Sequence, residues 1–199
     1  VDEATIESQS IGSTISNEMR SNAVKALIVA CIFMLFYIWF RFKDIRFAGS
    51  AIIALVHDVL VMLTGYALIR ISVGNTFIAC ILTIVGYSIN DTIVIFDRIR
   101  ENMQGMKKQT PETLAEVANR SLTQTLSRSL NTSITTIIMV LLLFILGVSS
   151  IREFALPLMI GLISGTYSSI FIAAALWYVM KLHLGKDKLM KAAAKTKKK

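Results

Sequence analysis

The chain has 199 residues, of which 54% are hydrophobic and only 17% are charged, whereas a soluble domain carries about 25% charged residues. The mean hydropathy of +0.63 indicates a membrane protein. The net charge of +8 needs no nucleic-acid partner, because Lys and Arg gather in short clusters between long uncharged runs. Both cysteines lie in apolar runs and there are only two histidines, which predicts no disulfide, no metal centre and no cofactor.

The first 21 residues are polar and include four acidic side chains, so they do not form a signal peptide. We interpret residues 1–21 as the end of a soluble region whose beginning is missing. The chain is accordingly expected to be a fragment of a longer protein.

Five long apolar runs follow this polar start. A transmembrane helix needs about 20 mostly apolar residues, and runs of this kind occupy residues 22–40, 47–69, 73–96, 128–148 and 154–180. The sequence therefore predicts an all-α bundle of five transmembrane helices covering residues 22–182.

The link between the third and fourth runs contains a predicted helix at residues 111–126. Thr110 is a suitable N-cap, Pro111 suits the first helical position, and Glu112 places a negative charge in the first turn. Apolar residues then recur at helical spacing. We expect either an amphipathic helix on the membrane surface or a connector packed on the end of the bundle.

The distribution of basic residues predicts the orientation. All but four of the 21 Lys and Arg residues lie in the first link, the long third link and the segment from Lys181 onward. Basic residues favour the cytoplasmic side, so the amino terminus is predicted outside and the carboxyl terminus inside a plasma membrane. The basic tail at residues 183–199 is expected to be attracted to anionic lipid headgroups.

Asp58 lies inside the second predicted span, about 16 Å from Phe47 along the helix. Charged groups at this depth are costly and mark functional candidates. Asp58, with His57 beside it, is either a proton-binding group or a buried polar contact between helices.

Asp91 lies in a polar break of the third span, about 27 Å from Val73. The break also contains Tyr87, Ser88 and Asn90. Tyr87, Ser88 and Asp91 are predicted to share one helix face. This makes Asp91 the stronger of the two carboxyl candidates.

Arg128 begins the fourth span and heads a polar stripe with Asn131, Thr132 and Thr135, at spacings of three, four and seven residues. Its predicted depth matches that of Asp91 within one helical turn. We therefore expect an Asp91–Arg128 pair facing the interior of the bundle.

Gly161 and Gly165 form a GxxxG pattern in the fifth span, with three serines nearby. Small residues at this spacing let helices approach closely. The pattern predicts helix packing and no chemistry.

The run from Gly86 to Met103, GYSINDTIVIFDRIRENM, resembles the signature of the SecD/SecF family of protein-export membrane proteins, on its SecF side. Three further segments, AIIALVHDVL, SLTQTLSRSLNTSITT and LMIGLISGTYSSIFIAAAL, support this resemblance. It implies half of the membrane domain found in the resistance-nodulation-division superfamily. It also implies that residues 1–21 are the end of an extracytoplasmic domain, including its last strand.

The resemblance also implies a function. Members of the family use the proton gradient to assist protein export across the bacterial plasma membrane, and the family's membrane Asp and Arg fall on Asp91 and Arg128. The implied partners are a SecD-like subunit or fused segment, the Sec channel and a translocating unfolded protein.

Other function classes are weighed against this one. A lipid or drug exporter of the same superfamily is the main alternative, and a purely structural scaffold is another. An intramembrane aspartyl protease using Asp58 and Asp91 lacks that group's paired motifs in this sequence. We therefore expect a chain that is not an enzyme.

Overall fold

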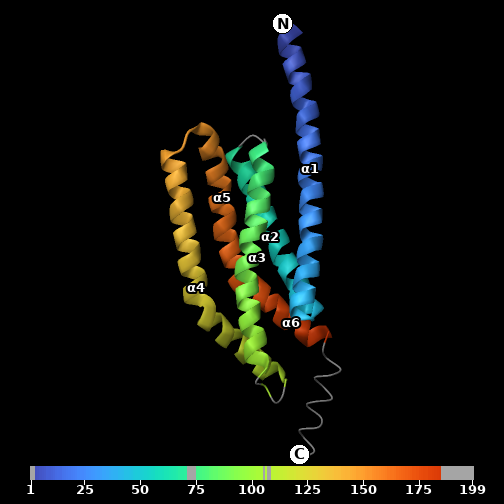
Figure 1. Cartoon of the computed structure of the whole chain (residues 1–199), viewed down its shortest axis with the longest axis vertical. Coiled ribbons are helices and arrows are strands. Elements are labelled where there is room, and N and C mark those ends of the chain that lie inside the picture. Colours follow the sequence, from blue (N-terminus) through green and yellow to red (C-terminus); the bar gives the residue numbers. More distant parts are fainter. Residues whose placement is uncertain (1–2, 71–74, 105, 107–108, 185–199) are drawn as a thin grey trace, which may run out of the picture.

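The computed structural model describes residues 3–70, 75–104, 106 and 109–184. They form a bundle of helices: α1 (Glu3–Phe42), α2 (Ile45–Ile69), α3 (Asn75–Gln104), α4 (Pro111–Leu146), α5 (Ser149–Tyr167), the π-helical segment η1 (Ser168–Ala173) and α6 (Ala174–Leu184). Figure 1 shows α3 in the middle of the bundle, with α1 and α4 on opposite sides of it. Within the described residues, five helices are long and apolar enough to cross a membrane, which confirms the predicted fold class.

Helix α1 continues well beyond the predicted first span. The apolar stretch is Ser21–Phe42, but residues 3–20 are helical as well, so the predicted terminal strand is wrong. A strand must pair with another strand to satisfy its backbone groups, whereas a helix satisfies its own. The described residues contain no strand that could pair. The N-terminal end of α1 extends beyond the other helices of the bundle (Figure 1).

Short connections join α1 to α2 and α4 to α5. Helix α2 begins after Asp44, whose side chain accepts a hydrogen bond from the backbone N–H of Arg46. It ends at Arg70, whose left-handed conformation (φ 56°) directs its backbone N–H to the carbonyl of Tyr66. Residues 71–74, where the third span was predicted to begin, and residues 185–199 of the basic tail lie outside the described residues.

Helix α4 replaces two predicted elements with one. It starts as predicted, with Thr110 as N-cap and Pro111 in the first turn. It then runs without a break from the predicted connector into the fourth span. Its first turns pack on the end of the bundle through Leu114, Val117 and Ala118, which are buried. The packed-connector alternative is therefore the correct one, and no separate surface helix exists in this segment.

The fifth span is interrupted by η1, which the sequence analysis did not predict. The chain leaves α5 at Tyr167, passes through one π-helical segment and continues as α6. Single π-turns inside α-helices are frequent at functional sites.

Two apolar clusters fill the bundle. One contains an aromatic group in which Phe47 stacks on Trp177 (ring centroids 5.2 Å apart) and meets Phe96 edge-on (4.9 Å). The other lies toward the opposite end and includes Met62, Ile84 and Leu162. Buried serines of α3, α5 and η1 occupy the chain positions between the two clusters, and with Asp58 of α2 they form the site described next.

Candidate functional site

Asp58 is completely buried (0% exposed) and its carboxylate joins three elements to α2. Its Oδ2 accepts hydrogen bonds from the hydroxyls of Ser88 on α3 and Ser168 on η1, both at 2.6 Å. Its Oδ1 accepts a hydrogen bond from Ser164 on α5 at 2.8 Å. Buried polar groups are costly unless hydrogen-bonded. These three serines, which we call the serine cradle, satisfy Asp58 inside the membrane region.

Gly161 and Gly165 allow the serine cradle to close. A side chain at Gly161 would collide with Ile84 of α3, and a Cβ at Gly165 would lie 3.2 Å from the Cβ of Ser88. The two glycines therefore bring α5 close to α3, so that hydroxyls of both helices reach Asp58. The sequence analysis interpreted the neighbouring serines as packing residues only and missed their contact with the carboxylate.

The π-helical segment directs two consecutive hydroxyls to two different helices. Ser168 binds Asp58 of α2, whereas Ser169 lies 2.9 Å from the hydroxyl of Thr92 on α3 and also donates to the backbone carbonyl of Ser88. Both serines are fully buried. η1 therefore fixes α2 and α3 through adjacent residues.

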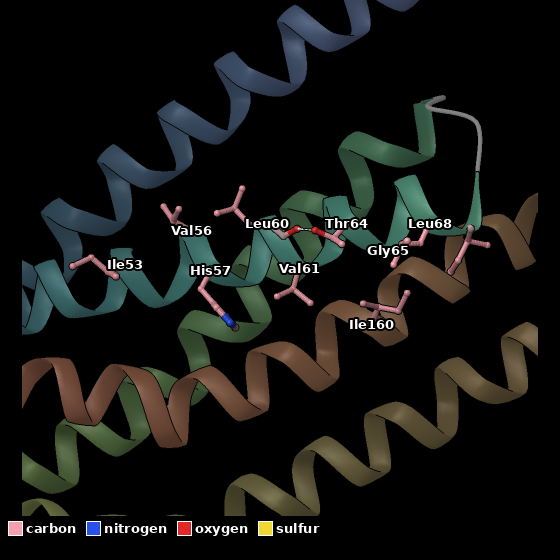
Figure 2. A pocket seen from close by; sticks show the side chains of 10 residues that line it. Ile53, Val56, His57, Leu60, Val61, Thr64, Gly65, Leu68 and Ile160 are labelled. Carbon is pink, nitrogen blue, oxygen red and sulfur yellow. Dashed lines mark hydrogen bonds between the residues drawn. The ribbon is translucent and has the colours of Figure 1, made fainter.

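His57 connects this buried cluster to the outside of the bundle. Its Nδ1 lies 3.2 Å from Oδ1 of Asp58, and its side chain is 37% exposed. Figure 2 shows its imidazole among the apolar side chains that line a groove of about 650 Å³ between α2 and Ile160 of α5. Thr64 is the other polar residue of the lining, and its hydroxyl is bonded to the Leu60 carbonyl.

Asp91 has a different environment, on the side of α3 that faces α4. It is 4% exposed, and its Oδ2 has no hydrogen-bond partner among the described residues. Helix α4 packs against α3 and bears both Arg128 and the buried Ser133. No ion pair joins Asp91 to Arg128 in the described part of the chain, and Arg128 itself is exposed.

The predicted polar stripe of α4 does not face the interior of this bundle. Arg128, Asn131 and Thr135 are exposed and Thr132 is only half-buried. The two threonine hydroxyls bond to carbonyls of their own helix. The interior instead receives a row of small hydroxyl residues spaced four apart, namely Ser121, Thr125, Ser129 and Ser133. Small side chains permit close helix packing, which a row headed by arginine would prevent.

Ser133 is the meeting point of this row with α3 and α5. Its Oγ accepts a hydrogen bond from the Tyr87 hydroxyl at 3.2 Å and lies 2.7 Å from the Thr166 hydroxyl. Of the predicted residues of the α3 polar break, Ser88 thus faces Asp58, Tyr87 faces Ser133, and Asn90 is exposed. The break therefore contributes to two hydrogen-bonded clusters on different sides of α3.

The carboxyl groups are not arranged as a metal site. Among the described residues, no group of three or more His, Cys, Asp or Glu side chains gathers as a metal ion would require. The buried donors are hydroxyls, which suit hydrogen bonding to a carboxyl group and transfer of a proton. A helical membrane protein with two buried carboxyls in a hydroxyl-rich layer is the class that this fold and site define.

Comparison with known proteins identifies the family. Residues 1–183 match the model of the family described as "Protein export membrane protein SecD/SecF, C-terminal". The chain belongs to this family and corresponds to the C-terminal membrane part of SecF. Together with the five apolar helices, this makes it a multi-pass protein of the bacterial membrane.

Individual relatives agree with this assignment. The chain is 46% identical over 172 residues to the protein translocase subunit SecF of Alicyclobacillus acidocaldarius, covering 86% of this chain and 56% of that protein. It is 46% identical to the subunit SecDF of Thermus thermophilus over 86% of this chain and 23% of that protein. The chain therefore spans about half the length of the SecF relative and about a quarter of the SecDF relative.

Solved structures share the fold. The crystal structure of SecDF in a super-membrane-facing form superimposes with a TM-score of 0.77 at 43% identity, over 88% of this chain and 23% of that chain. A second crystal structure, of SecDF from Thermus thermophilus, gives a TM-score of 0.75 at 45% identity, covering 81% of this chain and 22% of that one.

Proposed function

We propose that this segment is the proton-carrying membrane part of an accessory subunit of the Sec preprotein translocase. In this role it assists protein export, together with a SecD-like partner, the Sec channel and the translocating unfolded protein. The observation that carries the proposal is the buried Asp91 carboxyl, which has an unpartnered oxygen and faces a helix bearing a permanent positive charge. The family membership and the names of the relatives support the link to export.

The two groups have complementary chemistry for proton transport. Arginine stays protonated in proteins, so Arg128 supplies a fixed charge, whereas Asp91 can gain and lose a proton. Burial opposes the ionised carboxylate and a nearby positive charge favours it, so movement of α3 relative to α4 changes the balance. One charge crossing the membrane yields about 2.3 kcal/mol per 100 mV. That energy is sufficient to shift a conformational equilibrium of a few kcal/mol.

Mutation of the full-length protein tests this role directly. Asp91→Asn and Arg128→Met should each abolish proton-gradient-dependent export while the protein remains inserted in the membrane. Asp97→Asn is the matched control, because Asp97 lies on the same helix but is partly exposed and pairs with Arg41. Near-normal export by Asp91→Asn under an intact proton gradient would contradict the carrier role and leave Asp58 as the alternative.

The exposed polar face of α4 is the proposed contact with the SecD-like partner. Arg128, Asn131 and Thr135 lie in a span-length helix, where polar side chains avoid lipid and face protein or a water-filled cavity. We expect the segment to be less heat-resistant alone in detergent than in the assembly with its partner. Equal heat resistance of the two preparations would refute this dependence.

The end of the bundle with the basic residues is proposed to lie in the cytoplasm, near anionic lipid. Ion pairs cluster there, where Lys181 of α6 meets Asp44 and Arg41 of α1 meets Asp97 of α3. Single cysteines at Gln9 and at Lys107, which lies outside the described residues, should react from opposite sides in a background without Cys31 and Cys80. Labelling of both positions from one face by an impermeant reagent would reject this orientation.

A further inference from the structure

Thr92 of α3 bonds its hydroxyl to another helix, although a threonine can bond back to its own. Thr83, on an exposed face of the same helix, donates to the Ala79 carbonyl one turn earlier. The Thr92 hydroxyl instead lies 2.9 Å from the hydroxyl of Ser169 on η1, and both side chains are buried. Thr92 therefore joins two helices at a position where its own helix also offers an acceptor.

A second hydrogen bond fixes the direction of the first. The Ser169 hydroxyl donates to the backbone carbonyl of Ser88 at 3.2 Å. A hydroxyl has one hydrogen to donate, so Thr92 donates to Ser169. The Ser88 carbonyl lies four residues before Thr92, and it is the acceptor that a threonine at this position can reach within its own helix. Ser169 thus occupies the acceptor that Thr92 would otherwise use.

Ser88 is held from two sides. Its side chain donates to Asp58 of α2, and its backbone carbonyl accepts from Ser169 of η1. Ser168, the residue before Ser169, donates to the same oxygen of Asp58. Contacts from α2 and η1 therefore meet α3 at Ser88 and Thr92, which lie about one helical turn apart. Two contacts at this spacing fix the rotation of α3 about its own axis.

Asp91 lies between these two contacts in the chain. At 3.6 residues per turn, its side chain leaves α3 about 100° away from that of Thr92 and about 60° away from that of Ser88. It is therefore turned away from the face that α2 and η1 hold. The rotation fixed at Ser88 and Thr92 consequently determines the direction in which the Asp91 carboxyl points.

We propose that Thr92 and Ser169 are positioning residues for Asp91 and form a releasable latch between α3 and η1. When the latch is closed, Thr92 donates to Ser169 and α3 has a single rotation. When it is open, the Thr92 hydroxyl donates to the Ser88 carbonyl that Ser169 has left. Thr92 keeps a hydrogen bond in both states, so opening the latch avoids the cost of an unsatisfied buried hydroxyl on α3.

This inference rests on the proposed carrier role of Asp91, because that role requires α3 to move relative to α4. The latch supplies the contact that must open for α3 to turn. Asp58 remains bonded to Ser164 of α5, so the serine cradle retains a contact that does not involve α3.

Hydroxyl-deletion variants of the full-length protein with its partner test the latch. Thr92→Val removes the hydrogen bond to Ser169 with a side chain of similar shape, and proton-dependent export should fall about threefold to tenfold, as expected for the loss of one hydrogen bond. Thr92→Ser keeps the hydroxyl and should restore export. Thr83→Val is the matched control on α3 and should export normally, because the Thr83 hydroxyl is exposed and bonds only to its own helix.

Two further measurements distinguish the positioning of Asp91 from a loss of packing. The carbonyl stretching band of protonated Asp91 is identified in infrared difference spectra by its loss in Asp91→Asn. This band should broaden in Thr92→Val and not in Thr83→Val, because α3 no longer has a single rotation. Adding Thr92→Val to Ser169→Ala should lower export no further, since the two variants remove the same hydrogen bond.

The outcomes separate this inference from the proposed function. Export and band width in Thr92→Val equal to those in Thr83→Val, with export still abolished in Asp91→Asn, overturn the latch alone. A double variant whose loss equals the product of the two single losses also overturns it. Normal export in Asp91→Asn overturns the proposed function and the latch with it. If Ser169→Ala fails to insert, the Thr92 variants decide, and equal export by Thr92→Val and Thr92→Ser rejects the latch.

Discussion

The two buried carboxyls of this bundle lie in opposite kinds of environment. Asp58 is enclosed by three hydroxyl donors from α3, α5 and η1. Asp91 has an oxygen without any partner among the described residues and faces α4, whose outer side bears exposed Arg128. A fully paired carboxylate fixes the helices around it, whereas an incompletely paired one can change protonation without dismantling the core. We therefore propose that Asp58 holds the bundle together and that Asp91 is the group that exchanges protons.

The same comparison predicts how each carboxyl responds to protonation. A protonated carboxyl must donate one hydrogen bond, so the three serine donors around Asp58 could not all keep their present direction. Any proton reaching Asp58 therefore requires a rearrangement of the serine cradle. Asp91 has an oxygen without a partner among the described residues, so no comparable set of hydrogen bonds opposes its protonation.

The largest expected effect is the loss of stability on removing the Asp58 carboxylate. Asp58→Ala leaves three buried hydroxyls without their acceptor, each worth about 1–3 kcal/mol, so we expect a loss of about 3–5 kcal/mol in the free energy of unfolding in detergent. Asp91→Asn should change it by less than about 1 kcal/mol, because Oδ2 of Asp91 has no hydrogen-bond partner among the described residues to lose. Equal losses in the two variants would remove the distinction between the sites.

A second prediction concerns the close approach of α5 and α3 that forms the serine cradle. Gly161→Ala places a methyl group against Ile84 and should cost about 1–3 kcal/mol, because the core cannot admit extra volume without strain. Gly86→Ala is the control on α3, since nothing lies within 4 Å of its added Cβ. Thermal unfolding of both variants measures the difference. A stability of Gly161→Ala no lower than that of Gly86→Ala would show that this contact is not tight.

The smallest expected effect is that of Arg128→Met on the isolated segment. Arg128 is exposed and forms no ion pair in the described residues, so the free energy of unfolding should change by no more than about 0.5 kcal/mol. The same substitution should weaken co-purification with the SecD-like partner. A large loss of stability without the partner would place Arg128 inside this bundle.

Much of the fold follows from hydropathy and capping residues alone. The five spans and the Thr110–Pro111 helix start were predicted correctly. The continuous α4 was not, because the boundary at residue 128 was inferred from a change of composition. No glycine or second proline interrupts the helix between Pro111 and Gly147, so nothing in the backbone stops it.

The acidic residues of the candidate site could be predicted from the sequence, but its serine and threonine residues could not. Asp58 and Asp91 stood out because charge inside a span is rare, and both are buried. Serines are common in membrane helices and gave no comparable signal, although the spacing of four from Ser121 to Ser133 was visible. Helix α4 carries two polar stripes, and periodicity cannot tell which of them faces the core. The π-helical segment that aims Ser168 and Ser169 has no compositional signature.

The measurement that tests the central claim most directly is the infrared difference spectrum of the full-length assembly when a proton gradient is imposed. The account predicts a carboxyl carbonyl band that disappears in Asp91→Asn and persists in the control Asp97→Asn. A band that remains in Asp91→Asn and disappears only in Asp58→Asn would contradict the assignment of Asp91 as the exchanging carboxyl.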